Sequence, residues 1–142
     1  MIVLDTNVIS EVLRPVPNEL VLAWMRAMKR SELCTCSIVL AELYSGVDLM
    51  PDGKRQHTLR EKMDQLVSLL FAEKVLGFDV AAARKYGEIF AARHRAGRPI
   101  QAIDAQIVAI ASVHGASLAT RNIRDFKDCG VVLINPWQPP VA

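Results

Sequence analysis

The sequence predicts an α/β fold, a single domain of three layers in which helices cover both faces of a central parallel sheet. Short apolar runs, typical of strands buried on both sides, alternate along the chain with stretches whose apolar residues have helical spacing. The first apolar run, residues 1–4, leads directly into Asp5, Thr6 and Asn7. Ligands of open α/β sheets bind at the carboxyl ends of strands, so these three residues are candidate site residues. The alternative is a plain strand end at which Thr6 or Asn7 caps the next helix.

Length and composition fit one compact domain. The chain has 142 residues, of which 51% are hydrophobic and 23% charged, so a sizeable core is expected. We expect the domain to span residues 1–137 and residues 138–142 to form a loose tail. The sequence shows neither an apolar run as long as a membrane span nor a signal-peptide pattern. Its odd number of cysteines, three, predicts buried, reduced thiols in a cytoplasmic protein.

The first half of the chain predicts two strands and four helices. Pro15 and Pro17 end the first helix, and Asn18 caps the second. Ser37 is the expected cap of a third helix, in which Glu42 lies among apolar neighbours and therefore needs solvent or a partner. The expected ranges are helices 8–14, 19–30, 38–49 and 54–71, and strands 1–4 and 33–36.

The second half predicts three more strands and two helices. Asp79 caps a helix that ends at Gly97, and a second helix carries Asp104 in its first turn and ends near Gly115. A polar segment, residues 120–125, follows the fourth strand. The expected ranges are strands 75–78, 116–120 and 131–134, and helices 80–96 and about 102–114.

Four acids from distant parts of the chain are predicted to meet at one edge of the sheet: Asp5, Glu42, Asp104 and Asp125. Carboxylates this close repel one another, which raises their pKa values. A hard cation such as Mg²⁺ removes the conflict, because it prefers oxygen ligands and keeps several waters. Taken singly, each acid also has a structural interpretation, such as a favourable helix-dipole position for Asp104.

The remaining charges are basic. Without these four acids, the chain has 17 Lys and Arg against 11 of its 15 Asp and Glu. An acidic pocket in a basic frame suits a polyanion that is held by its phosphates. The alternative is a solvated basic face. The arginines expected to contact phosphates are Arg93, Arg95, Arg98, Arg121 and Arg124.

Four short segments carry a family resemblance: IVLDTN at residues 2–7, LAELYSG at 40–46, IDAQI at 103–107 and ATRNIRDF at 119–126. In this order and at these separations they resemble the PIN-domain family, specifically the VapC and FitB-like toxin ribonucleases of type II toxin–antitoxin systems. The resemblance runs from Met1 to about Trp137, nearly the whole chain.

The resemblance implies a PIN-like fold and an Mg²⁺-dependent endoribonuclease, with Mn²⁺ as a possible substitute, that hydrolyses RNA and inhibits translation or growth. It implies metal ligation by Asp5, Asp104 and Glu42. Many members carry Asp where this chain has Asn122; the amide can still hydrogen-bond water, and Asp125 can supply the fourth catalytic charge. The residues expected to support the site or contact substrate are Thr6, Asn7, Thr120, Asn122, Arg98 and Arg121.

Two partners are also expected besides RNA. The resemblance implies a cognate antitoxin that blocks the acidic pocket, and a homodimer. The residues themselves also suggest association, because helices 19–30 and 54–71 carry more apolar surface than one sheet needs to cover.

Other protein classes fit less well. A response-regulator receiver needs paired acids at the first strand and a late Lys, and an aspartate-nucleophile phosphatase needs Asp where Asn7 stands. No G-x-G-x-x-G, P-loop or G-x-S-x-G motif occurs. The alternative that the sequence leaves open is a non-catalytic PIN-like module for nucleic-acid binding or interaction, because Asn122 replaces an acid.

Overall fold

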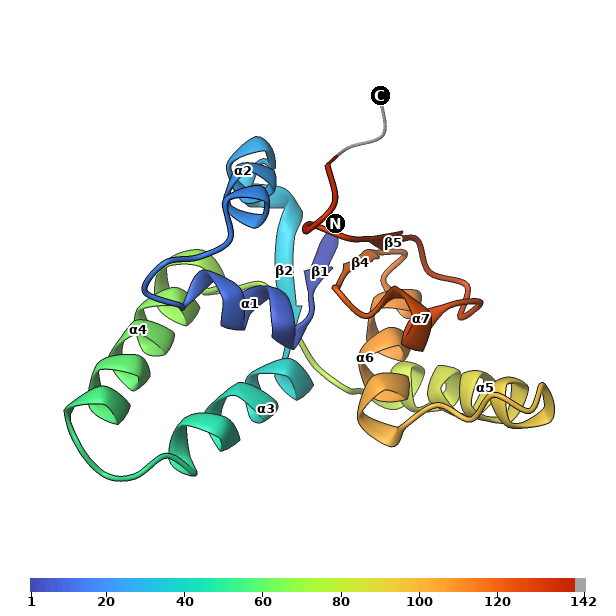
Figure 1. Ribbon diagram of the computed structural model, residues 1–142. Coiled ribbons are helices and arrows are strands. Elements are labelled where there is room, and N and C mark those ends of the chain that lie inside the picture. Colours follow the sequence, from blue (N-terminus) through green and yellow to red (C-terminus); the bar gives the residue numbers. More distant parts are fainter. Residues whose placement is uncertain (140–142) are drawn as a thin grey trace.

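The computed structural model describes residues 1–139 and contains a parallel sheet of five strands (Figure 1). The strand order is β3-β2-β1-β4-β5, and every neighbouring pair is parallel. The predicted α/β fold is therefore confirmed. Residues 140–142 of the expected tail lie outside the described residues. The strands are β1 (Ile2–Leu4), β2 (Leu33–Cys36), β3 (Val75–Leu76), β4 (Ser117–Ala119) and β5 (Leu133–Ile134).

Helices cover the sheet on both sides, as three layers require. In Figure 1, α1 to α4 lie on one side of β1 and β2, and α5 and α6 lie on the other. No described helix has the length and apolar character needed to cross a membrane. The helices are α1 (Thr6–Val12), α2 (Glu19–Ala27), α3 (Ser37–Asp48), α4 (Lys54–Leu70), α5 (Val80–Arg95), α6 (Ala102–Val113) and α7 (Ile123–Phe126), with a 3₁₀ turn η1 (Arg30–Glu32).

Two of the four predicted helix caps are confirmed. Asn18 accepts backbone N–H bonds at the start of α2, and Asp79 does so at the start of α5. The predictions for α1 and α3 were wrong. Asp5 itself caps α1, because the helix begins directly at the strand end. Ser37 lies inside α3, after Cys36 at the cap position.

Glycine ends α5 and α6 in the same way. Gly97 and Gly115 have φ of +72° and +62°, a region that glycine adopts without steric cost. After Gly97, the Arg98 N–H returns to the Arg93 carbonyl at 3.0 Å, and Gly97 N–H bonds the His94 carbonyl at 3.1 Å. This is a Schellman motif, which satisfies the last carbonyls of a helix. It confirms the predicted position of Gly97.

The centre of the domain is α6, which packs against β4 and α5. Six of its residues are buried, so its apolar surface extends well beyond one stripe. The helical spacing of Ile103, Ile107 and Ile110 predicts that all three lie in the core, but Ile103 is 44% exposed. The apolar stripes of α2 and α4 also pack on the core, with Val21 and Met63 fully buried. Other residues of these stripes, such as Trp24 and Leu66, stay partly exposed, so part of the surface that the sequence suggested for association remains.

Arg93 is a structural residue, and its predicted contact with phosphate was wrong. It is only 8% exposed. Its guanidinium donates to the carbonyls of Arg98 at 2.7 Å, Asp125 at 3.0 Å and Lys127 at 3.4 Å, and to Sγ of Cys129 at 3.3 Å. One side chain thus ties the end of α5 to α7 and the loop that follows it.

We expect Arg93→Ala to lower the free energy of unfolding by about 2 to 4 kcal/mol, because it leaves several carbonyls without their donor. Urea unfolding followed by circular dichroism measures the change. Arg95→Ala is the matched control, since Arg95 is exposed in the same helical turn; its effect should stay within about 1 kcal/mol. Equal losses in the two variants would contradict this structural role.

Candidate functional site

Two neighbouring strand ends are joined by a side-chain network. Because β1 and β4 pair in parallel, Leu4 lies opposite Ala119, and the next residues are Asp5 and Thr120. The buried Thr120 hydroxyl donates to Oδ2 of Asp5 at 2.7 Å. Asn7 bridges the two strand ends: its amide nitrogen lies 3.4 Å from Oγ1 of Thr120, and its Oδ1 accepts the Arg121 N–H at 3.2 Å.

Asp5 is held in one orientation and shielded from solvent. It is 5% exposed, and its Oδ1 accepts the N–H of Thr6 at 2.8 Å. Burial raises the pKa of the Asp5 carboxyl, the bonds from Thr120 and Thr6 lower it, and the charges of Glu42 and Asp125 raise it further. The carboxylate therefore combines a capping role with a position facing other acids.

Glu42 reaches the same place from α3. Oγ1 of Thr6 donates to Oε1 of Glu42 at 2.8 Å. Thr6 thus contacts both acids, Asp5 through its backbone N–H and Glu42 through its hydroxyl. Glu42 lies among apolar residues of α3 and therefore needs a hydrogen-bond partner, which the Thr6 hydroxyl provides.

Asp104 completes the convergence from the first turn of α6. Burial and the charges of Asp5, Asp125 and Glu42 together raise its pKa to about 6, against a smaller opposing effect of Arg93. The structure therefore brings the four predicted acids close enough for mutual repulsion. Asp125 is exposed on α7, a short helix that the sequence did not predict.

The donor set suits a hydrated ion. Within residues 1–139, no three His, Cys, Asp or Glu side chains lie close enough together to bind one metal ion directly. Oxygen donors from acids that repel one another nevertheless match Mg²⁺, which retains several waters and needs few protein ligands. The residues fit such an ion chemically, and bridging waters would make part of the contact.

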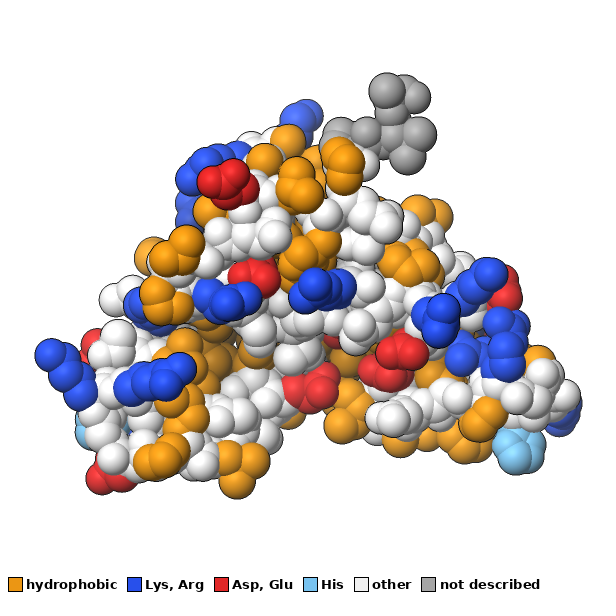
Figure 2. All heavy atoms as spheres, in the orientation of Figure 1, with side chains coloured by type: hydrophobic (Ala, Val, Ile, Leu, Met, Phe, Trp, Pro, Cys, Tyr) orange, Lys and Arg blue, Asp and Glu red, His pale blue; other side chains and the backbone are white. Residues whose placement is uncertain are grey.

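A hollow of about 510 Å³ is lined by three of these acids, Asp5, Glu42 and Asp104. Figure 2 shows acidic side chains in the middle of this face, with Lys and Arg on both sides of them. Of the predicted site residues, Asp125, Thr120 and Arg98 are not in its lining. Arg98 instead pairs with Asp128 at 2.9 Å. The predicted residues that line the hollow are Asp5, Thr6, Asn7, Glu42, Asp104, Arg121 and Asn122.

Four further lining residues were missed in the sequence: Ser10, Glu11, Arg14 and Trp137. Glu11 is 6% exposed, and it accepts bonds from Arg14 and from the Asn18 N–H. Three of the four were detectable, because Asn7, Ser10, Glu11 and Arg14 follow each other at helical spacing after Asp5. Trp137 had no such signal, since it reaches the hollow only through the path of the chain after β5.

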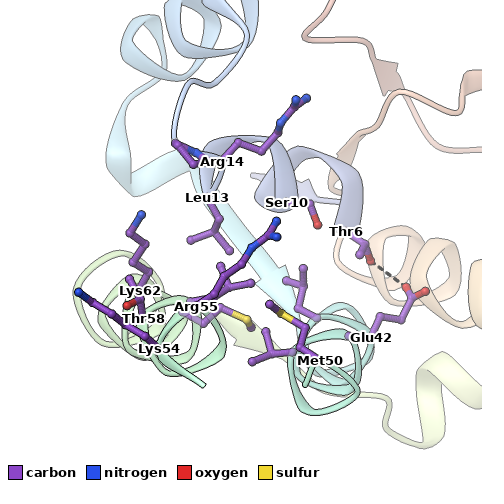
Figure 3. A pocket seen from close by; sticks show the side chains of 16 residues that line it. Thr6, Ser10, Leu13, Arg14, Glu42, Met50, Lys54, Arg55, Thr58 and Lys62 are labelled. Carbon is purple, nitrogen blue, oxygen red and sulfur yellow. Dashed lines mark hydrogen bonds between the residues drawn. The ribbon is translucent and has the colours of Figure 1, made fainter. Parts of the chain in front are cut away.

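An apolar groove of about 700 Å³ adjoins the hollow and shares with it Thr6, Ser10, Arg14 and Glu42. Leu43, Val47 and Met63 are among the apolar residues that line it. Figure 3 shows Thr6 and Glu42 at one end of the groove, with Arg14, just after α1, and basic side chains of α4 around it. Gly46 also lines the groove. A glycine inside a helix predicts close packing against a neighbour, but a Cβ at Gly46 would meet no atom within 4 Å, so this prediction was wrong.

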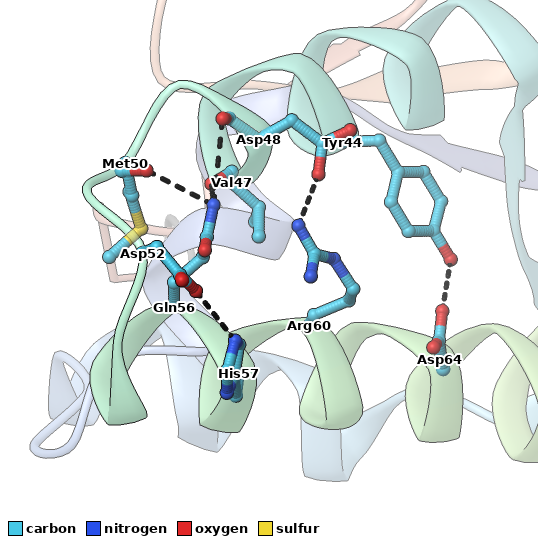
Figure 4. Close-up of polar contacts among 9 residues, drawn as sticks. All are labelled: Tyr44, Val47, Asp48, Met50, Asp52, Gln56, His57, Arg60 and Asp64. Carbon is cyan, nitrogen blue, oxygen red and sulfur yellow. Dashed lines mark hydrogen bonds and ion pairs between the residues drawn. The ribbon is translucent and has the colours of Figure 1, made fainter.

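Polar contacts fix the wall of this groove that α3 and α4 form (Figure 4). The buried Gln56 amide donates to the carbonyls of Val47 at 2.9 Å and Met50 at 3.1 Å. Farther along, Arg60 pairs with Asp48 at 2.6 Å, and the Tyr44 hydroxyl donates to Asp64 at 2.7 Å. These bonds connect α3 to α4 beside the groove.

The fold and the site together define the class of this protein. It is a three-layer α/β protein with a cluster of carboxylates at the carboxyl edge of a parallel sheet. The sequence of the chain matches the family model of the PIN domain over residues 2–131. The chain therefore belongs to the PIN-domain family, as its motifs indicated.

Characterised relatives are similar over almost their whole length. The chain is 44% identical to the plasmid stability protein StbB of Pseudomonas syringae pv. tomato, over 97% of this chain and 99% of that one. It is 41% identical to the toxin FitB of Neisseria gonorrhoeae, over 96% and 99%. It is 40% identical to the VapC ribonuclease Y4jK of Sinorhizobium fredii, over 98% and 99%. A solved structure of FitAB bound to a DNA fragment superposes with a TM-score of 0.93, at 40% identity and 99% coverage of both chains.

Proposed function

We propose that this chain is a divalent-metal-dependent endoribonuclease and the toxin of a toxin–antitoxin pair. The observation that carries the proposal is the convergence of Asp5, Glu42, Asp104 and Asp125 beside basic side chains. The names of the relatives support it, since one is called a toxin and another a ribonuclease.

The acids have distinct supporting contacts, which suggest their roles. Asp5, Glu42 and Asp104 would hold Mg²⁺, or Mn²⁺ in its place. A bound ion would orient the attacking water and stabilise the negative charge that develops on the phosphodiester. Attack by this water would leave 5′-phosphate and 3′-hydroxyl ends. Thr120 and Thr6 keep Asp5 and Glu42 in place for this, through the bonds described above.

We assign the role of the fourth acidic residue of the site to two residues of the α7 region together. Asn122 lines the hollow and its N–H donates to Oγ1 of Thr120 at 3.0 Å. Asp125 does not line the hollow and acts through its charge on Asp5 and Asp104. Asn122 would orient water in the hollow, and Asp125 would add negative charge without direct ligation. A non-catalytic module is the alternative function, favoured by the amide at position 122.

Asp104→Asn should abolish RNA cleavage, because it removes a carboxylate that would hold the ion. Gel analysis of RNA incubated with purified chain, with Mg²⁺ or with EDTA, measures this. Glu61→Gln, which neutralises an exposed acid of α4, is the control and should cleave normally. Cleavage that continues in EDTA would overturn the mechanism, and a chain that binds but never cleaves RNA would support the non-catalytic module.

The stability of the same variant shows whether Asp104 is merely structural. Its raised pKa means that the folded chain disfavours the charged carboxylate. The resulting decrease in the free energy of unfolding is absent below about pH 4 and grows as the pH rises through about 6. Asp104→Asn should therefore be as stable as the unchanged chain or more so at pH 7.5, by up to about 1 to 2 kcal/mol after screening. The gain should shrink towards pH 4. Asp5→Asn is less suitable, because both carboxylate oxygens of Asp5 accept hydrogen bonds and an amide has only one accepting oxygen.

The apolar groove is the proposed site of the antitoxin. Its lining is mostly apolar and its surroundings include Arg14, Lys54, Arg55 and Lys62, which suits a segment with an apolar face and acidic flanks. Because the groove opens onto Glu42, an Arg or Lys of that segment could enter the acidic hollow. Such a cation would replace the charge of the ion and silence the enzyme.

Gly46→Arg should prevent capture of the antitoxin, because it places a long charged side chain in the groove at a position where an added Cβ meets no atom within 4 Å. Affinity purification of the tagged chain from its own cells, followed by mass spectrometry, measures the loss. Gly87→Arg is the matched control: Gly87 is an exposed helical glycine of α5 outside this groove. If both variants recover the same small partner, the partner binds elsewhere.

A homodimer is proposed from surface that the fold leaves uncovered. Val80 of α5 and Val113 of α6 are 72% and 38% exposed and line the same shallow hollow, and exposed apolar surface commonly marks an interface. We expect light scattering of the isolated chain at micromolar concentration to give twice the mass of 15.7 kDa. Val80→Lys should shift that mass towards one chain, whereas a monomer before substitution would contradict the dimer.

A further inference from the structure

Arg121 and Trp137 form a stacked pair in the lining of the acidic hollow. The guanidinium carbon of Arg121 lies 5.2 Å from the centroid of the Trp137 ring. Both residues line the hollow that contains Asp5, Glu42 and Asp104. The hydrogen bonds to the acids described above do not involve the side chains of Arg121 and Trp137, so this pair is not needed to position the acids.

The backbone positions both members of the pair. The Arg121 N–H donates to Oδ1 of Asn7 at 3.2 Å, which fixes where the residue leaves β4. The Trp137 N–H donates to Oδ1 of Asn135 at 2.9 Å, in a turn that follows β5. Because β4 and β5 are parallel neighbours, with Ala119 opposite Ile134, the two side chains leave the same edge of the sheet. The pair is therefore preorganised by strand pairing.

Such a pair has the chemistry to bind an unpaired nucleobase. Bases stack on aromatic rings and on guanidinium planes, and base–aromatic stacking contributes about 1 to 3 kcal/mol per base. Arg121 also carries a charge that attracts phosphate, whereas the acids repel it. A base bound here would place its own phosphate beside the carboxylates, and the stacked bases of a duplex could not offer a free face.

We propose that Arg121 and Trp137 stack an unpaired base of the RNA next to the phosphodiester that is cleaved. The proposal rests on the ribonuclease function proposed above. It makes Trp137 a residue that binds substrate, although it carries no charge and lies beyond the acidic motifs. The competing explanation is that the pair only fastens the C-terminal segment to the sheet.

Tryptophan fluorescence separates these explanations. The chain has two tryptophans, so Trp24→Phe leaves Trp137 as the only one, and Asp104→Asn is added to prevent cleavage. A short oligouridylate should quench Trp137 and bind about ten- to a hundredfold more tightly than an abasic oligoribose phosphate of equal length and charge. Equal quenching and equal affinity for the two oligomers would overturn the proposal.

Kinetics of the otherwise unchanged chain provide a second measurement. Trp137→Leu should raise KM about ten- to a hundredfold, whereas Trp137→Phe, which keeps an aromatic face, should recover most of the loss. Arg121→Met should also raise KM, more than Arg124→Met, which removes the same charge from exposed α7. Thermal unfolding identifies any variant that fails to fold, in which case the fluorescence titration decides.

The outcomes distinguish this inference from the function on which it rests. If the unchanged chain cleaves RNA and Trp137→Leu leaves KM unaltered, the stacking site is overturned and the ribonuclease stands. If the unchanged chain shows no metal-dependent cleavage and binds both oligomers alike, the proposed function and the stacking site fail together.

Discussion

The parallel pairing of β1 with β4 is the constraint on which the site depends. It places Asp5 and Thr120 side by side immediately after Leu4 and Ala119, and the hydroxyl of Thr120 donates to the carboxylate at 2.7 Å. Parallel neighbours cannot be joined by a tight turn, so residues 115 positions apart in the chain meet only because helices return the chain to the same edge. Glu42 and Asp104 are then added from helices that make these returns, and Asp125 from α7, which follows β4.

The acidic cluster costs stability, and the surrounding bonds limit that cost. Desolvation and mutual repulsion raise the pKa values of Asp5 and Asp104. Donors from Thr6 and Thr120 partly offset this by stabilising the charged carboxylates. Residual repulsion of this kind is what a bound cation would relieve, so the same feature that weakens the metal-free fold would favour the ion.

Arginines that look equivalent in the sequence have different roles in the structure. Arg93 is buried and serves backbone carbonyls, and Arg98 forms an ion pair with Asp128 away from the hollow. Arg121 stacks on Trp137 beside the acids. Five donors in a rigid fork suit all three tasks. Burial and the nearest acceptors therefore decide what each arginine does, and neither is encoded in local spacing.

The sequence by itself determined the architecture and most of the acidic cluster, because both depend on local signals. Apolar runs and helical spacing predicted the strands and helices, and the apolar run at residues 1–4 placed Asp5 at the end of a strand. Local signals did not assign the caps at Asp5 and Cys36, the exposure of Ile103 or the burial of Arg93. Those depend on which elements pack against each residue. Only the tertiary structure placed Trp137 beside Arg121, because two strand ends come together across the sheet through backbone pairing that no single segment contains.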